Sequence, residues 1–82
     1  MEEWFVYALE SLKDKNLYIG ISQDPEKRVE THNKGKTEST RNRRPLVLIY
    51  KESCHSLKEA RQKEKYNKSG FGREVLKNLI PW

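Results

Sequence analysis

The stretch from Trp4 to Ile21 constrains the fold most, because it reads as two short strands around a polar turn. Each run is rich in β-branched and aromatic residues, and residues 13–16, Lys-Asp-Lys-Asn, separate the two runs. Branched and aromatic side chains favour strands, whereas Asp and Asn favour turns. The stretch therefore predicts a β-hairpin near the start of the chain.

Alternation along the strands divides this hairpin into two faces, since successive side chains of a strand point in opposite directions. With an even number of loop residues and no bulge, Tyr7 and Tyr18 share one face, together with Phe5, Leu9 and Gly20. The other face is uniformly apolar and is predicted to be core: Val6, Ala8, Leu17, Ile19 and Ile21. The face with two phenols is either an active site or half-buried packing, which is common for cross-strand tyrosines.

A helix is predicted to follow the hairpin. Asp24 can cap its free amides and Pro25 suits its first position; it should run to about Asn33 and close at Gly35 in a left-handed conformation. Arg28 and His32 are four residues apart and so lie on one face. Such a pair is commonly solvated surface; alternatively, it places a permanent cation and a titratable imidazole together over the hairpin.

Residues 34–44, KGKTESTRNRR, are polar and basic, which indicates a loop. Glu38 is the only acidic residue among them. The segment is either a solvated connector or a surface that contacts phosphates without reading bases. Its candidate nucleic-acid-binding residues are Lys34, Lys36, Arg41, Arg43 and Arg44.

The apolar run from Leu46 to Tyr50, after Pro45, is typical of a strand buried on both faces, either central in the sheet or covered by helices. Ser56 and Glu59 then form a capping box, which predicts a helix to about Lys68. A last short helix is expected from about Arg73 to Ile80.

Glu64 lies on the same stripe of the second helix as Leu57, Ala60 and Arg61, and so is expected on or near its inward side. A buried carboxylate needs a partner, because an unpaired buried charge is costly. The structural explanation is a nearby Arg or Lys, and the functional one is a bound cation.

Composition narrows the class of protein. Eighty-two residues are enough for one domain, which we expect to span residues 1–82. The net charge of +5 and the pI of about 9.4 favour a polyanionic partner, although many small basic proteins are charged for solubility. No apolar run of about 18 residues, no secretory signal and a single cysteine predict a cytoplasmic protein without a membrane span, a disulfide or a cysteine metal cluster.

Five residues stand in a recognisable order and spacing. Tyr7 ends Phe5-Val6-Tyr7, Tyr18 begins Tyr18-Ile19-Gly20, and Arg28, His32 and Glu64 follow. This constellation resembles the GIY-YIG nuclease domain, in particular its small stand-alone members, which are similar to the N-terminal domain of an excinuclease. The first triplet keeps only its tyrosine. Larger members carry an asparagine after the glutamate helix, and the sequence leaves open whether Asn67 or Asn78 takes its place.

The resemblance implies an α/β fold with a small three-stranded sheet, mixed but mainly antiparallel and flanked by helices, in the order β-β-α-β-α-α. It implies a Mg²⁺- or Mn²⁺-dependent endonuclease that hydrolyses DNA with low intrinsic sequence specificity, in repair or recombination. DNA is then the expected partner, and a protein partner would supply specificity. The alternatives are a non-catalytic nucleic-acid-binding module of the same fold and a partner-recognition module without nucleic-acid affinity.

The resemblance also implies roles for individual residues. Glu64 would hold the metal ion, and Arg28 would bind the equatorial phosphate oxygens. Tyr7 resembles the general base of the family. Because a free phenol has a pKa of about 10, this role requires nearby positive charge to favour the phenolate.

Three further residues complete the expected site. Tyr18 would orient the attacking water or Tyr7, and His32 would relay the proton. Gly20 would leave room for a phosphate backbone to approach the sheet.

Overall fold

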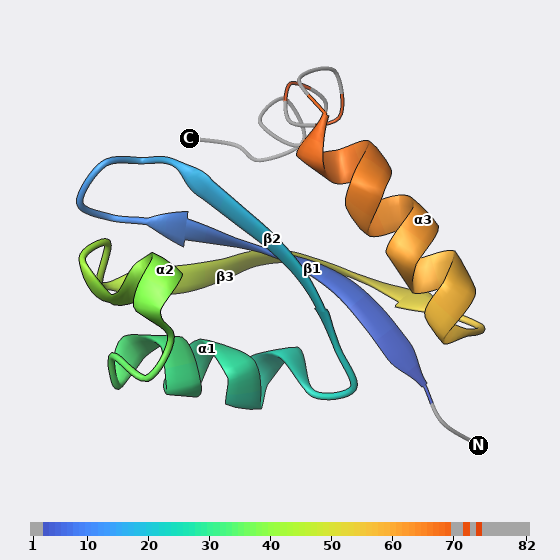
Figure 1. Cartoon of the computed structure of the whole chain (residues 1–82), viewed down its shortest axis with the longest axis horizontal. Helices are drawn as coiled ribbons and strands as arrows, with labels where there is room; N and C mark the ends of the chain where they lie inside the picture. The colour runs from blue at the N-terminus through green and yellow to red at the C-terminus, as the bar shows by residue number, and fades with distance from the viewer. Residues whose placement is uncertain (1–2, 70–71, 73, 75–82) are drawn as a thin grey trace.

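The computed structural model describes residues 3–69, 72 and 74 of the chain. Its elements follow the order expected from the sequence, with one short helix in addition (Figure 1). The last predicted helix, Arg73 to Ile80, lies outside the described residues except for Glu74. The elements are β1 (Trp4–Ser11), β2 (Leu17–Ser22), α1 (Pro25–Asn33), α2 (Glu38–Arg41), β3 (Leu46–Cys54) and α3 (Leu57–Lys68).

The three strands form one sheet in the order β2-β1-β3, and both pairings are antiparallel. The register places Tyr7 opposite Gly20 and Leu9 opposite Tyr18, which confirms that the two tyrosines share a face. The sheet is therefore three-stranded, as expected. In the described residues it contains no parallel pair, so the expected mixed character is not seen.

β3 is an edge strand, which corrects one of the two placements that its apolar run allowed. The central strand is β1, and Val47 of β3 is 38% exposed. The run is apolar because helices cover parts of both faces: Leu46 and Leu48 pack on the side of α1, and Ile49 and Tyr50 on the side of α3. A bulge beside Ala8 and Leu9 shifts the pairing of β1 with β3 at this point.

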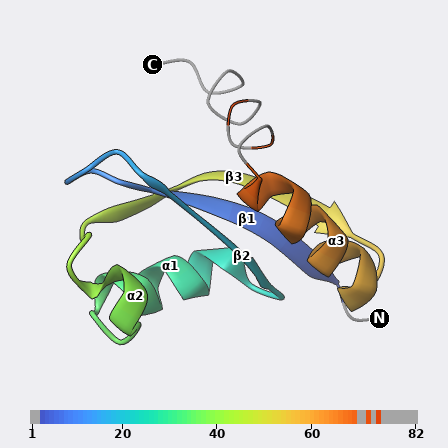
Figure 2. The same ribbon diagram turned by 45° about the horizontal axis from the view of Figure 1, so that its top comes forward.

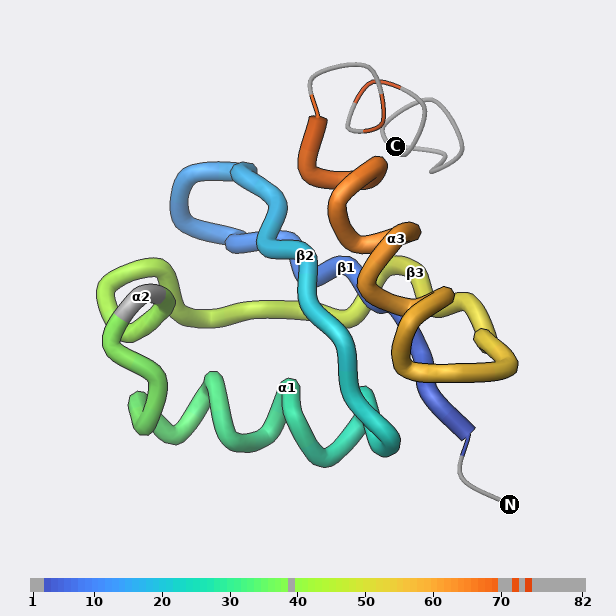
Figure 3. Tube along the Cα trace, turned by 45° about the vertical axis from the view of Figure 1, so that its right-hand side comes forward, coloured from blue at the N-terminus to red at the C-terminus, as the bar shows by residue number. Residues whose placement is uncertain are grey.

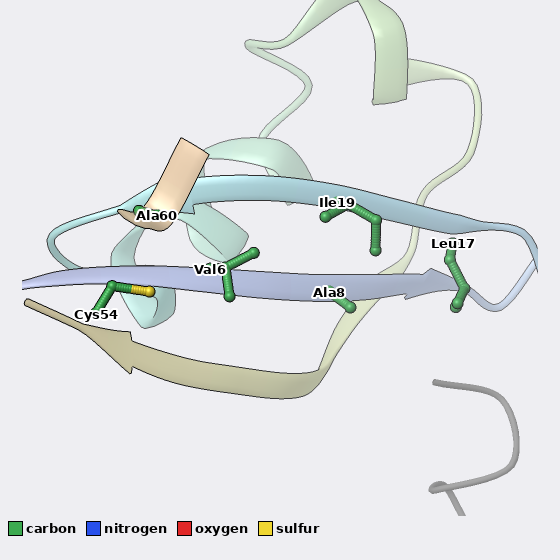
Figure 4. Close-up of a cluster of buried hydrophobic side chains, with 6 residues drawn as sticks. All are labelled: Val6, Ala8, Leu17, Ile19, Cys54 and Ala60. Atoms are coloured by element: carbon green, nitrogen blue, oxygen red, sulfur yellow. The ribbon is translucent and has the colours of Figure 1, made fainter. Parts of the chain in front are cut away.

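Two helices cover opposite faces of the sheet (Figure 2). On one face Ala60 of α3 packs with the apolar side of the hairpin and with Cys54 (Figure 4). On the other face Val29 of α1 packs against Tyr7, Leu9 and Leu46. β2 passes between α1 and α3 and contacts both (Figure 3). Among the described residues, no helix is long and apolar enough to cross a membrane.

Local capping sets the ends of the helices where the sequence predicted them. The Asp24 carboxylate accepts a hydrogen bond from the Lys27 amide at 3.1 Å, and Gly35, just after α1, has φ +78°. At α3 the Ser56 hydroxyl accepts from the Glu59 amide at 3.1 Å. The Glu59 carboxylate accepts from the amide of His55 at 3.4 Å, one residue before the cap of an ideal capping box.

Candidate active site

Tyr7 is fully buried at the centre of the sheet, with 1% of its surface exposed. Its phenol lies across the strand pair against Gly20. A Cβ atom at residue 20 would stand 2.6 Å from Tyr7 Oη and 2.8 Å from Tyr7 Cζ. We predicted that this glycine leaves room for a phosphate backbone, but the room is taken by the end of the Tyr7 side chain.

The surroundings of Tyr7 raise its pKa above 10, mainly because burial disfavours the charged phenolate. The Arg28 guanidinium lowers this pKa through hydrogen bonding and charge, whereas Tyr18 and Glu64 raise it. Arg28 therefore supplies part of the positive charge that the role of general base requires, but in the protein alone it does not offset burial. The same interactions show that Tyr18, Arg28 and Glu64, each from a different element, lie within electrostatic range of Tyr7.

Glu64 is only partly buried, since 24% of its side chain is exposed. Its Oε2 lies 3.3 Å from Lys68 Nζ, one helical turn further on. Lys68 is therefore the cationic partner that one of the two readings of the sequence expected for the Glu64 carboxylate. Because the Lys68 side chain is 51% exposed, the pair is a surface salt bridge worth at most about 1 kcal/mol and does not lock the carboxylate.

His32 is fully buried rather than solvated. Its Nδ1 lies 2.7 Å from Thr40 Oγ1, and the Thr40 hydroxyl donates to the Thr37 carbonyl at 3.4 Å. In the tautomer that matches this donation by Thr40, Nδ1 is protonated and Nε2 carries a lone pair. Nε2 is buried and has no hydrogen-bond partner in the described part of the chain.

The imidazole of His32 meets the ring of Tyr18 edge to face, with ring centroids 4.9 Å apart and an angle of 61° between the planes. Burial lowers the pKa of His32 below 6.5, and the Arg28 charge lowers it further. His32 is therefore a neutral imidazole at pH 7, placed next to Tyr18 and influenced by Arg28.

The donor set around Glu64 suits an ion that keeps most of its waters, such as Mg²⁺, and not a zinc ion held by protein ligands alone. Among the described residues, no three or more His, Cys, Asp or Glu side chains converge on one point. An all-protein cage for zinc is therefore absent from this part of the chain. Mg²⁺ keeps several waters and is commonly held by one or two carboxylates plus substrate phosphates, so a single partly exposed glutamate is compatible with it.

The basic segment after α1 contains α2, a single helical turn, where composition indicated only a loop. Two of its arginines fold the segment. Arg41 Nε donates to the Gly35 carbonyl at 3.0 Å, and Arg44 Nε donates to the Arg41 carbonyl at 2.9 Å. Both side chains therefore hold the loop together, which sequence reasoning did not anticipate.

The remaining basic side chains of the segment differ in their surroundings. Arg43 Nε lies 3.7 Å from the carboxylate of Asp14 in the hairpin turn. Lys34 and Lys36 are exposed and form no ion pair with any described residue. These two lysines are the side chains of the segment most available to an anionic partner.

Asn33 is a positioning residue that sequence reasoning missed. Its Oδ1 accepts from the Leu46 amide at 2.8 Å, and its Nδ2 donates to the Leu46 carbonyl at 2.9 Å. The side chain thus ties the end of α1 to the start of β3. An asparagine in the last turn of a helix is a weak signal, because its partner lies 13 residues further along the chain.

Comparison with known proteins gives this geometry a context. A family model described as the GIY-YIG catalytic domain matches residues 3–78. The UPF0213 protein SH2523 of Staphylococcus haemolyticus is 40% identical over 81 residues, which cover 98% of this chain and 96% of that protein. The UPF0213 protein YazA of Bacillus subtilis is 45% identical over 65 residues, covering 78% of this chain and 65% of that protein.

A solved structure agrees with these matches. The solution NMR structure of the UPF0213 protein BH0048 from Bacillus halodurans is 34% identical to this chain. It superposes with a TM-score of 0.58 over 94% of this chain and 84% of that one. Fold, family model and relatives agree: the chain belongs to the GIY-YIG family of nuclease-type domains, among small UPF0213 proteins.

Proposed function

We propose that this protein is an endonuclease that hydrolyses DNA phosphodiester bonds with little intrinsic sequence preference, dependent on Mg²⁺ or Mn²⁺, in repair or recombination. The observation that carries the proposal is that Tyr18, Arg28 and Glu64 all act electrostatically on Tyr7, in a domain of the GIY-YIG family. Nuclease families of this kind generally use a divalent metal, and a single carboxylate on α3 suits that use.

Glu64 is the proposed metal ligand, with water and phosphate oxygens completing the coordination. When bound, the ion would polarise the phosphate and stabilise the negative charge of the leaving 3′ oxygen. The ion would also replace Lys68 as the partner of the carboxylate. This exchange costs little, because the existing pair is largely solvated.

Arg28 is proposed to bind the scissile phosphate. Its planar guanidinium matches two equatorial phosphate oxygens, which gain negative charge in the transition state. Its charge already acts on both Tyr7 and His32 and lowers the pKa of each. The guanidinium therefore acts on both groups proposed to handle the proton.

Tyr7 is proposed to take the proton of the attacking water. As the water oxygen bonds to phosphorus and the bond to the 3′ oxygen breaks, the water proton passes to the phenolate Oη of Tyr7. Burial raises the pKa of Tyr7, so its phenolate forms only when additional positive charge enters the site. Tyr18 would orient the water or Tyr7, and the free Nε2 of His32 would relay the proton.

The basic segment is proposed to bind the DNA backbone outside the site. Lys34 and Lys36 are the side chains best placed for it. Arg41, Arg43 and Arg44 would contribute charge while their present contacts keep the segment folded. Contacts of this kind carry no sequence information, so a protein partner would supply specificity.

The test is a cleavage assay with purified protein on supercoiled plasmid and on branched DNA, with Mg²⁺, with Mn²⁺ and with EDTA. We expect nicking that EDTA abolishes. Arg28→Lys keeps the positive charge but loses the planar pair of N–H donors. It should lower the nicking rate at least about 10-fold, because removing one such donor commonly lowers kcat about 100-fold or more. Nicking that survives EDTA and is unchanged in Arg28→Lys would contradict the proposal.

The raised pKa of Tyr7 specifically favours a second candidate, a non-catalytic nucleic-acid-binding module of the same fold. A neutral phenol at pH 7 can donate a hydrogen bond to a phosphate but cannot accept a proton from water. This candidate predicts DNA or RNA binding that weakens steeply with salt and no cleavage with any metal.

A further inference from the structure

A groove of about 500 Å³, open to solvent, is lined by residues from the start of β1, the end of β2 and the start of α1. Figure 1 shows where these three segments lie in the fold. Grooves of this volume accommodate small organic groups. Of its lining residues, only Arg28 has a proposed catalytic role, and none belongs to the basic segment. Its main lining side chains are Trp4, Ile21, Gln23, Lys27, Arg28 and Thr31.

Arg28 connects the groove to the candidate site. The same side chain lines the groove and acts electrostatically on Tyr7 and His32. A phosphate bound by this guanidinium would therefore lie at the groove and within electrostatic range of Tyr7. The nucleotide next to that phosphate is the part of a nucleic acid within reach of the groove.

One wall of the groove consists of apolar side chains that pack against the core. Trp4 and Ile21 come from paired strands, with Val6 opposite Ile21 and Trp4 two residues earlier. Both side chains pack in part against the core cluster under α3 and remain partly exposed. An indole held in this way offers a flat surface at low entropic cost, and any nucleobase can stack on it.

The other wall is positively charged. Lys27 and Arg28 form no salt bridge with any described residue, so their charges are available to an anion. Asp24 also lines the groove, but its Oδ1 accepts the Lys27 amide as the cap of α1. An aromatic side chain and two cations that line the same groove match a nucleotide, with an apolar base and an anionic phosphate.

We propose that this groove binds the nucleobase adjacent to the scissile phosphate, stacked on the indole of Trp4. The inference rests on the proposed function, because it takes the phosphate at Arg28 to be the one that is cleaved. Stacking requires a free base face, so the nucleotide in the groove is unpaired. Trp4 is then a substrate-positioning residue that does not take part in the chemistry.

Fluorescence can test binding separately from cleavage. The chain has two tryptophans, so a Trp82→Phe variant reports Trp4 alone. In EDTA, we expect a single-stranded oligonucleotide to quench this emission in a saturable way and a blunt duplex of the same sequence to quench it much less. Equal quenching by the single strand and the duplex would contradict the claim that the bound base is unpaired. Binding without any quenching would contradict the claim that the base lies in this groove.

Substitutions provide the second arm of the test. Trp4→Ala should weaken oligonucleotide binding by about 5- to 100-fold, the usual cost of losing one stacked base, whereas Trp4→Phe should stay within about 3-fold. Leu12→Ala is the matched control, because Leu12 is also a large exposed apolar side chain, just beyond the opposite end of β1. Circular dichroism of each variant checks folding, since Trp4 also touches the core.

The outcomes separate this inference from the proposed function. If Trp4→Ala cleaves DNA with an unchanged KM, and the emission of Trp4 is not quenched, the proposed nuclease activity is supported and the proposed base site is contradicted. If the emission is quenched but no metal supports cleavage, the base site is supported and the proposed nuclease activity is contradicted. No binding to any oligonucleotide at low salt would overturn both.

Discussion

At the scale of single residues, Tyr7 and Gly20 depend on each other. The phenol occupies the volume that any side chain at residue 20 would need. The strand pattern predicted that the two residues share a face, but not that they touch. Contact depends on the register of β1 with β2 and on the rotamer of Tyr7, and neither can be read from one strand.

Gly20→Ala should therefore destabilise the protein by about 1 to 3 kcal/mol, the usual cost of overpacking a core. In an unstrained strand the same change is stabilising, so the contact with Tyr7 decides the sign. Urea unfolding of the variant measures the cost. In a Tyr7→Phe background, which lacks Oη, the penalty should fall by at least about 0.5 kcal/mol, and an equal penalty would contradict the contact.

His32 makes stability depend on pH. Burial holds the pKa of His32 below 6.5 in the folded protein, whereas the unfolded chain has the ordinary value of about 6.5. As the pH falls below about 6.5, the unfolded state gains a proton that the folded state does not. Stability should then fall by up to about 1.4 kcal/mol per pH unit, until the pH reaches the folded pKa.

Urea midpoints between pH 7.5 and 5.5 check this expectation. His32→Gln should be less stable at pH 7.5, because the ring and its bond to Thr40 are lost, but its stability should depend less on pH. His55→Gln is the control, since His55 is exposed, and it should keep the wild-type slope. A slope unchanged in His32→Gln would contradict the buried neutral imidazole.

At the scale of elements, the parts predicted from sequence are those with local causes. α1 and α3 begin where Asp24 and Ser56 accept amides three residues ahead, and such caps are visible in a short window. The single turn of α2 was not predicted, because Thr37 makes no side-chain cap bond. The edge position of β3 was also missed, because it depends on which strands pair and not on its own residues.

The connection between α1 and β3 gives an element-scale prediction. Asn33→Ala removes two hydrogen bonds to the backbone of Leu46 and should lower the free energy of unfolding by about 1 to 3 kcal/mol. Thr31→Ala, in the same helix, is the control. Among the described residues its hydroxyl bonds only to the Lys27 carbonyl of its own helix, so its effect should stay within about 0.5 kcal/mol. Equal effects of the two variants in urea unfolding would contradict the tie.

At the scale of the whole molecule, helices on opposite faces of one small sheet bring separated residues together. The sequence predicted the residues of the candidate site through family resemblance, but not their electrostatics. Whether Arg28 or burial dominates the pKa of Tyr7 depends on the packing of three strands and two helices. The pairing of Glu64 with Lys68 was foreseeable as an i,i+4 pair on α3, whereas the Coulombic effect of Glu64 on the pKa of Tyr7 depends on how α3 packs on the sheet.

Glu64 is proposed to hold the metal ion for phosphodiester hydrolysis, and one comparison of two variants tests this central assignment most directly. The single-turnover rate of plasmid nicking in Mg²⁺ is measured for Glu64→Gln and Glu59→Gln, two identical changes on α3. Glu59 binds Lys63 at 3.5 Å and lies outside the candidate site. We expect Glu64→Gln to lose at least about 100-fold and Glu59→Gln to stay within about 3-fold of wild type. Equal rates for the two variants would contradict the assignment of Glu64.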